Sequence, residues 1–333
     1  MDASVAAKNA LKNVLEAKIN EKIVVICDKE KTKIGEAFAK GALDLDLWTR
    51  LIILKKHENP RISIPKHLEE ILTQKPNIYI NLLSGTREET PFRIKLIKKE
   101  TASHESRLGH CPGVTYDMLT EGALALTSEE HKTMQSNAER LMKILESSII
   151  VKVTNPSGTN VSFNTNGRRF ITDTKLDWKT MKWMNLPTGE VFVAPVEDSL
   201  NGKLVCDMAV GGIGKLRKPV EITAKNGKVI KTYSDDKENL SRIKETFQMD
   251  KWANVVGEFA FGINPKARFV DEFLEAEKLL ATVHFAFGEN TDMPGGKNPS
   301  KNHMDMLISE PTVTVVKHNG EIITILEKGN FRV

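Results

Sequence analysis

The chain has 333 residues, of which 40% are hydrophobic and 28% are charged, so its composition excludes a disordered protein and allows two domains of ordinary size. It contains no apolar run long enough to cross a bilayer, and Lys and Glu interrupt the apolar pattern of the N-terminus where a signal peptide would have an uncharged core. We therefore expect a cytoplasmic protein that binds no membrane. The net charge of +4 is spread along the chain and aromatic residues make up only 6%, so we do not expect nucleic acid as a partner.

The first third of the sequence alternates between helical and strand patterns. Apolar residues at helical spacing predict a helix over residues 4–19, and the apolar run at residues 23–27 predicts a strand that is covered on both faces. Helices are then expected at residues 32–43 and from Pro65 onward, and strands at residues 51–54 and 77–83. This alternation predicts a parallel sheet with helical crossovers, and none of its strands is followed by a glycine-rich phosphate loop.

The pattern changes after a long helix. Thr127-Ser-Glu-Glu130 has the form of a capping box and opens a helix that runs to about Ser147. Two further helices are expected over residues 237–249 and 270–280. The expected strands cover residues 149–153, 160–164, 190–194, 204–210, 221–223, 228–233, 282–287, 304–308 and 312–317. We therefore expect an α/β domain with a parallel sheet over residues 1–148, followed by an α+β domain of mainly antiparallel strands over residues 149–333.

Acidic residues and histidines recur beside the strands of this second domain, close to glycine and phenylalanine. The positions are Glu190, Glu258 and His284, followed by the pair His303 and Asp305. A carboxylate or imidazole beside a core strand is partly desolvated, and either a metal ion or a salt bridge can offset that cost. The three cysteines lie too far apart for a zinc knuckle or a disulfide framework, and we expect them to be free, mostly buried thiols.

The pair His303 and Asp305 is the most informative of these positions. Side chains two residues apart on a strand point to the same face, so imidazole and carboxylate can converge on one cation. Nitrogen together with carboxylate oxygen suits zinc, manganese, cobalt or ferrous iron rather than calcium. Such a pair alone is usually a surface feature, and the inference gains strength because acidic and histidine positions recur in one domain.

As an ordered set, four segments resemble the thermophilic aminopeptidase T type of metallo-aminopeptidase and its leucyl-aminopeptidase-like relatives. They are residues 186–195, residues 257–265, Glu277 with residues 282–288, and residues 303–305. The resemblance implies a homodimer in which two divalent ions per chain, zinc, cobalt or manganese, activate a water molecule. It implies that Glu190 or Glu258 acts as a bridging ligand or as the general base. The implied metal ligands are Glu190, Glu258, Glu277, His284, His303 and Asp305.

The sequence departs from the family pattern at two positions. Thr291 stands where the peptidases have a tyrosine that can stabilise an oxyanion. Glu277 lies two residues farther from His284 than its counterpart does, and Glu275 is a near alternative for the same role.

A separate segment of the first domain, residues 107–113, resembles part of the wider group. Its Arg107 and His110 are candidate substrate-binding residues that could reach the site of the second domain, although a structural loop explains them equally well.

Three functions remain open from the sequence. The first is a metal-dependent hydrolase, most simply an aminopeptidase that acts on short peptides. The second is a mononuclear Fe(II) dioxygenase that opens dihydroxypyridine rings, with His284, His303 and Asp305 as the iron ligands. The third is a non-catalytic relative, which the retention of every acidic and histidine position argues against.

Overall fold

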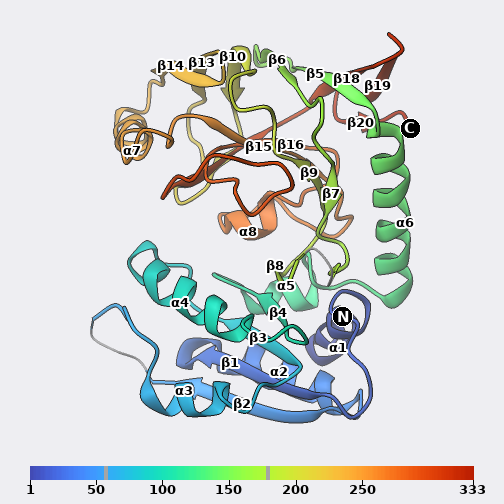
Figure 1. Cartoon of the computed structure of the whole chain (residues 1–333), viewed down its shortest axis with the longest axis vertical. Helices are drawn as coiled ribbons and strands as arrows, with labels where there is room; N and C mark the ends of the chain where they lie inside the picture. Colours follow the sequence, from blue (N-terminus) through green and yellow to red (C-terminus); the bar gives the residue numbers. More distant parts are fainter. Residues whose placement is uncertain (56–58, 178–180) are drawn as a thin grey trace. The chain divides into compact units, whose positions relative to one another are not determined.

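A computed structural model describes residues 1–55, 59–177 and 181–333 of the chain. These residues form two compact units (Figure 1), each made from three segments of the sequence. The first unit consists of Met1–Ser136, Asp173–Thr188 and Pro265–Arg268, and the second of Asn137–Thr172, Gly189–Asn264 and Phe269–Val333. Helix α6 (Ser128–Leu145) contains the first point of division. Among the described residues, no helix combines the length and apolar character needed to cross a membrane.

The first unit contains the predicted parallel sheet, with the strand order β2-β1-β3-β4-β8. Its strands are β1 (Lys22–Asp28), β2 (Trp48–Leu54), β3 (Ile78–Leu82), β4 (Arg107–His110) and β8 (Trp183–Asn185). Its helices are α1 (Ala3–Asn13), α2 (Thr32–Leu43), α3 (Lys66–Leu72), α4 (Thr90–Glu100) and α5 (Tyr116–Thr120), with 3-10 turns η1 (Lys29–Lys31) and η2 (Arg87–Glu89). The α/β class of this part is therefore confirmed.

The central strand β1 is buried on both faces, as its continuous apolar run predicts. Val25 and Cys27 belong to a core that includes residues of α1 and α2, whereas Val24 and Ile26 belong to a second core with residues of α3 and α4. All three cysteines of the chain are buried and free, as expected.

Helix α1 ends at Asn13, earlier than the predicted residue 19. The guanidinium of Arg107 donates hydrogen bonds to the backbone carbonyls of Leu15 and Glu16, the latter at 2.8 Å. Both carbonyls lie beyond the last helical residue, and Glu16 has a positive φ of 49°, a backbone conformation that cannot continue a right-handed helix.

The second unit contains two sheets with predominantly antiparallel pairing, which confirms the predicted α+β class. The eight-stranded sheet has the order β14-β13-β10-β6-β5-β18-β19-β20, and the seven-stranded sheet has the order β12-β11-β17-β16-β15-β9-β7. The eight-stranded sheet comprises β5 (Ser148–Thr154), β6 (Asn160–Asn164), β10 (Asn201–Cys206), β13 (Val220–Lys225), β14 (Lys228–Tyr233), β18 (Thr312–Lys317), β19 (Ile322–Glu327) and β20 (Asn330–Phe331).

The seven-stranded sheet carries the predicted ligand segments. It comprises β7 (Ile171–Thr172), β9 (Glu190–Val193), β11 (Ala209–Val210), β12 (Gly214–Lys215), β15 (Val256–Gly262), β16 (Val283–Gly288) and β17 (His303–Ile308). The helices α7 (Lys237–Phe247) and α8 (Phe273–Ala276) complete the described elements of this unit. The helix predicted over residues 270–280 is thus much shorter than expected.

The strand predicted over residues 204–210 is wrong in one respect, because it divides into β10 and β11 of different sheets. The break falls at Asp207, whose carboxylate accepts hydrogen bonds from the backbone N–H of Ser309 at 2.9 Å and from its hydroxyl at 2.7 Å. A polar residue that takes part in such contacts separates the buried end of β10 from β11.

Alternating phenylalanines place one face of the seven-stranded sheet in the core. The ring of Phe163 on β6 lies 4.9 Å from that of Phe259 on β15 and 5.6 Å from that of Phe285 on β16, measured between centroids. Because side chains alternate along a strand, the residues between these phenylalanines project from the opposite face. That opposite face carries the candidate site.

Candidate metal centre

Neighbouring strands of the seven-stranded sheet align the candidate ligands. Asp305 on β17 lies opposite Ala286 on β16, and Ala286 lies opposite Glu258 on β15, so the three positions share one face. His303 and His284 lie on the same face, because each stands two residues from one of these positions. The small side chain of Ala286 between the two carboxylates leaves room for a ligand.

The remaining two candidates, Glu190 and Glu277, stand at the start of a strand and directly after a helix. Glu190 is the first residue of β9 and lies opposite Gly262 of β15, whereas Glu277 directly follows helix α8. In the described part of the chain, three groups have ligand atoms that all lie within 4.8 Å of one another. They are Glu190, Glu258 and His284; Glu258, His303 and Asp305; and Glu277, His284 and Asp305.

All six predicted ligands therefore gather at one place, although their roles as ligands stay a prediction. Each group combines one histidine with two carboxylates. Glu277 belongs to a group, whereas the near alternative Glu275 belongs to none among the described residues.

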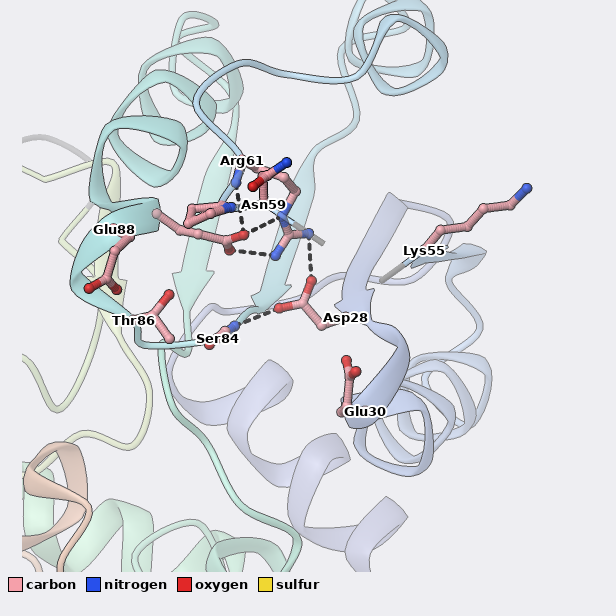
Figure 2. Close-up of a pocket in the computed structure, with 10 residues that line it drawn as sticks. Asp28, Glu30, Lys55, Asn59, Arg61, Ser84, Thr86 and Glu88 are labelled. Atoms are coloured by element: carbon pink, nitrogen blue, oxygen red, sulfur yellow. Dashed lines mark hydrogen bonds and ion pairs between the residues drawn. The ribbon is translucent and has the colours of Figure 1, made fainter. Parts of the chain in front are cut away.

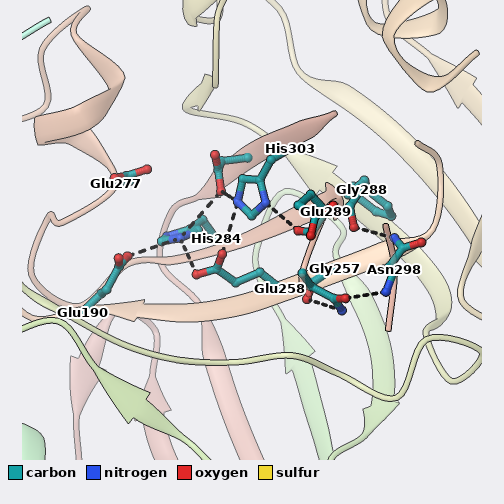
Figure 3. A network of polar contacts seen from close by, with 12 residues as sticks. Glu190, Gly257, Glu258, Glu277, His284, Gly288, Glu289, Asn298 and His303 are labelled. Atoms are coloured by element: carbon teal, nitrogen blue, oxygen red, sulfur yellow. Dashed lines mark hydrogen bonds and ion pairs between the residues drawn. The ribbon is translucent and has the colours of Figure 1, made fainter. Parts of the chain in front are cut away.

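Both histidines point toward the carboxylates (Figure 3). Nε2 of His284 lies 3.5 Å from Oε2 of Glu190, 3.7 Å from Oε1 of Glu258 and 3.9 Å from Oδ1 of Asp305. Nε2 of His303 lies 3.2 Å from Oε2 of Glu258 and 3.3 Å from Oδ1 of Asp305. Glu258 and Asp305 thus contact both imidazoles.

These contacts change the acidity of the groups. Desolvation acts to lower the pKa of His284, but Glu258, Glu190 and Asp305 together raise it to about 9. The pKa of His303 is likewise raised well above its usual value by Asp305 and Glu258, against the effect of desolvation. Burial acts to raise the pKa of Glu258, but the two histidines hold it well below its usual range. The imidazoles therefore hold protons that a metal cation would displace on binding.

A hydrogen bond to a backbone carbonyl fixes the orientation of the His303 ring. Nδ1 of His303 lies 2.8 Å from the backbone carbonyl of Glu289, so Nδ1 carries the proton that is donated to that oxygen. This arrangement directs Nε2 toward the carboxylates. Thr291, which stands at the position of the family tyrosine, donates from its hydroxyl and its N–H to the carboxylate of Glu289.

Lys278 is a member of the cluster that the sequence analysis missed. Its side chain is only 1% exposed, and Nζ forms ion pairs with Oε1 of Glu190 and, at 2.9 Å, with Oε1 of Glu277. Burial raises the pKa of Glu277, and Asp305 adds to that effect while Lys278 opposes it. Lys278 follows a helical charge pattern in the sequence, and only its burial distinguishes it from a solvated lysine.

The donor set fits a divalent cation. Four carboxylates and two imidazoles converge on one face of a sheet, so the negative charges repel one another unless cations offset them. Oxygen and imidazole nitrogen donors together suit zinc, manganese, cobalt or ferrous iron. Glu258, His303 and Asp305 would hold such an ion. In the described part of the chain, the buried Nδ1 of His284 has no hydrogen-bond partner.

The two predicted substrate-binding residues lie in the first unit, in strand β4 rather than in a loop. The guanidinium of Arg107 is 1% exposed and forms an ion pair with Glu21, in addition to its bonds with the end of α1. His110 is buried, and desolvation followed by the charge of Arg93 lowers its pKa to about 3. These contacts are structural, and they lend no support to substrate binding, which stays a prediction.

A cavity of about 340 Å³ lies in the first unit at the carboxyl ends of the parallel strands (Figure 2). Arg61 contacts Asp28 at 2.6 Å and Glu89 at 2.5 Å there, and the N–H of Ser84 donates to Asp28 at 2.6 Å. Two carboxylates therefore share the Arg61 guanidinium, whereas the cluster of the second unit gathers four carboxylates.

Comparison with solved structures shows that the fold is shared with known proteins. Two solved structures share the fold over nearly the whole chain. The 2,5-dihydroxypyridine dioxygenase from Pseudomonas putida KT2440 has a TM-score of 0.72 and 14% identity, covering 99% of this chain and 96% of that chain. AmpT from Thermus thermophilus has a TM-score of 0.71 and 15% identity, covering 100% of this chain and 99% of that chain.

Sequence comparisons give a more specific result than the shared fold. A search of curated proteins finds no match. Residues 127–331 match the model of the thermophilic metalloprotease (M29) family, a segment that includes all six candidate ligands. This match extends over more than half of the chain and agrees with the resemblance to aminopeptidase T seen in the sequence. The chain therefore belongs to the thermophilic metalloprotease (M29) family.

Proposed function

We propose that the chain is a metal-dependent aminopeptidase that removes N-terminal residues from short peptides. The observation that carries the proposal is the convergence of four carboxylates and two histidines on one face of the seven-stranded sheet. Membership of a metalloprotease family supports the hydrolytic class. The excess of acidic groups favours a substrate with a positively charged end, and the free amine of a peptide has that character.

The residues divide into two roles in this proposal. Glu258, His303 and Asp305 hold the divalent ion, because their ligand atoms converge and two of the three contact both histidines. When bound, such an ion lowers the pKa of a coordinated water and polarises the scissile carbonyl. Glu190 would act as the general base: its Oε2, the oxygen that faces His284, would accept a proton from the attacking water and pass it to the leaving amine.

The test is the release of N-terminal amino acids from a tripeptide with a free amine and from the same tripeptide with an acetylated amine. We expect hydrolysis of the free peptide alone, loss after chelation, and recovery when zinc, cobalt or manganese is returned. Glu190→Gln should lower kcat by at least about 100-fold, the range that general-base catalysis supplies. Glu221→Gln is a suitable control, because this glutamate lies on β13 of the other sheet and its side chain is 43% exposed.

Equal cleavage of both tripeptides, or full activity of Glu190→Gln, would contradict the proposed reaction. Metal binding without hydrolysis of any peptide would favour a second candidate function, a dioxygenase.

That second candidate is a mononuclear Fe(II) dioxygenase. Its specific support is that His284 and His303 both face Oδ1 of Asp305, at 3.9 and 3.3 Å, which supplies two histidines and one carboxylate. It ranks lower because each compact ligand group of the described residues contains only one histidine. Oxygen uptake by the Fe(II)-loaded protein in the presence of 2,5-dihydroxypyridine, without peptide hydrolysis, would favour it.

A further inference from the structure

Lys278 occupies a central place among the carboxylates of the candidate metal centre. Its ammonium contacts one oxygen each of Glu190 and Glu277, and its side chain is 1% exposed. Glu190 and Glu277 lie on the same side of His284 (Figure 3), away from His303. A positive charge is therefore built into one half of the cluster.

The backbone fixes the position of this lysine. The N–H of Asn264 donates to the carbonyl of Lys278 at 3.0 Å, and the N–H of Ala281 donates to the carbonyl of Gly262 at 2.9 Å. A Cβ atom at Gly262 would lie only 2.1 Å from the carbonyl oxygen of Leu279. Glycine at this position thus permits the close approach that brings Lys278 to the sheet.

The lysine divides the three ligand groups into two classes. One group contains Glu190 and another contains Glu277, and both of these carboxylates contact the Lys278 ammonium. The third group, Glu258 with His303 and Asp305, contains neither of them. An oxygen that accepts a hydrogen bond from an ammonium is a poor ligand for a second cation, and the like charges repel one another.

We propose that the Lys278 ammonium takes the place of a second metal ion, so that the chain binds one divalent ion through Glu258, His303 and Asp305. The inference deepens the proposed function, because it assumes that the centre binds a divalent cation. It replaces the two ions per chain that the sequence resemblance implies.

The charge of the cluster agrees with a single ion. The four carboxylates carry four negative charges in their ionised forms. One divalent ion together with Lys278 leaves a single negative charge, which can attract the amine of a peptide. Two divalent ions together with Lys278 would leave a single positive charge, which would repel that amine.

The test is the number of ions that the chelator-treated protein binds when it is dialysed against excess Co²⁺, measured by elemental analysis and by the visible absorption of bound cobalt. We expect one ion in the wild type and in Lys278→Arg, which keeps the charge. Lys278→Met should bind two, because it frees Glu190 and Glu277. Lys228→Met, at an exposed lysine of β14, should bind one.

A second pair of variants keeps the test decisive if Lys278→Met does not fold. Glu190→Gln should retain the single ion with less than about tenfold loss of affinity, whereas Glu258→Gln should lose it. Two ions in the wild type, one ion in folded Lys278→Met, or loss of the ion in Glu190→Gln would each overturn the inference.

These results also separate the inference from the proposed activity. One bound ion without peptide hydrolysis would overturn the aminopeptidase and leave the role of Lys278 intact. Two bound ions together with peptide hydrolysis would support the aminopeptidase and overturn the role of Lys278. A chain that binds no ion would contradict both.

Discussion

Two groups of buried ionisable side chains, one in each unit, differ in the partners that they find. In the first unit, Arg107 pairs with Glu21, and Arg61 pairs with Asp28 and Glu89, so basic groups meet acidic partners. In the second unit, four carboxylates gather around two histidines and one lysine, so that acidic groups are in excess.

The difference separates groups that stabilise the fold from groups that bind a ligand. A buried charge is costly unless a partner offsets it, and the pairs of the first unit meet that requirement within the chain. In the cluster of the second unit, the negative charges of the carboxylates are offset by protons on the two histidines or by an added cation. Substitutions in the two units should therefore differ in both size and metal dependence.

The largest effect is expected for Arg107→Met in the first unit. Removal of this buried guanidinium leaves Glu21 and two backbone carbonyls without their partner, so the free energy of unfolding should fall by about 3–5 kcal/mol. Denaturation in urea measures this change, and Arg50→Met at an exposed position is the control, with an expected change of less than about 0.5 kcal/mol. A loss below about 1 kcal/mol would mean that Arg107 contributes little to the stability of the fold, against the difference drawn between the two units.

The second-largest effect is the stabilisation of the protein by a metal ion bound to the second unit. A divalent ion at 100 times its dissociation constant should raise the free energy of unfolding by about 2.7 kcal/mol, because it binds the folded state alone. Glu258→Gln should abolish this gain, since the substitution removes a carboxylate that belongs to two ligand groups. Calorimetric unfolding with and without the ion measures it. Equal stabilisation of the variant would place the ion elsewhere.

The pH dependence of stability tests the first unit again. Burial lowers the pKa of His110 to about 3 and that of His131 to about 4, so at low pH the unfolded chain binds more protons than the folded chain. The stability contributed by each histidine should fall as the pH drops below about 6.5, by about 2 kcal/mol at pH 5.

Urea denaturation from pH 7 to pH 5 measures that slope. His110→Gln and His131→Gln should each make the slope shallower, and His67→Gln at an exposed position should leave it unchanged. An unchanged slope in both buried variants would show that these histidines do not govern acid stability.

The smallest effect is expected for Asp305→Asn in the presence of a chelator. The variant loses the contact with His303 but also reduces repulsion among the carboxylates, so the free energy of unfolding should change by less than about 1 kcal/mol. Thermal unfolding of the metal-free proteins measures the change. A loss as large as that of Arg107→Met would mean that Asp305 serves the fold rather than a ligand.

Much of the fold follows from local patterns in the sequence. The predicted helix over residues 32–43 coincides with α2, because an amphipathic pattern is a property of a continuous segment. Strand β4 was not predicted, since its four residues acquire their structure from pairing with β3 and with the distant β8. Long-range partners likewise divide β10 from β11 at Asp207.

The candidate site shows the same limit. The phenylalanine-rich segments around Glu258 and His284 indicate that these two residues stand beside core strands, and the family resemblance adds Glu277. Lys278 could not be identified in this way, because its burial depends on the approach of two chain segments at Gly262. The sequence thus indicates the ligand set, whereas the cation among the ligands appears only in three dimensions.

The most direct test of the metal centre is anomalous X-ray diffraction from crystals grown with excess Mn²⁺ or Zn²⁺. We predict a single strong peak per chain, enclosed by Glu258, His303 and Asp305, with the Lys278 ammonium still in contact with Glu190. A peak between Glu190 and Glu277 with Lys278 displaced, or no peak at the seven-stranded sheet, would contradict this account.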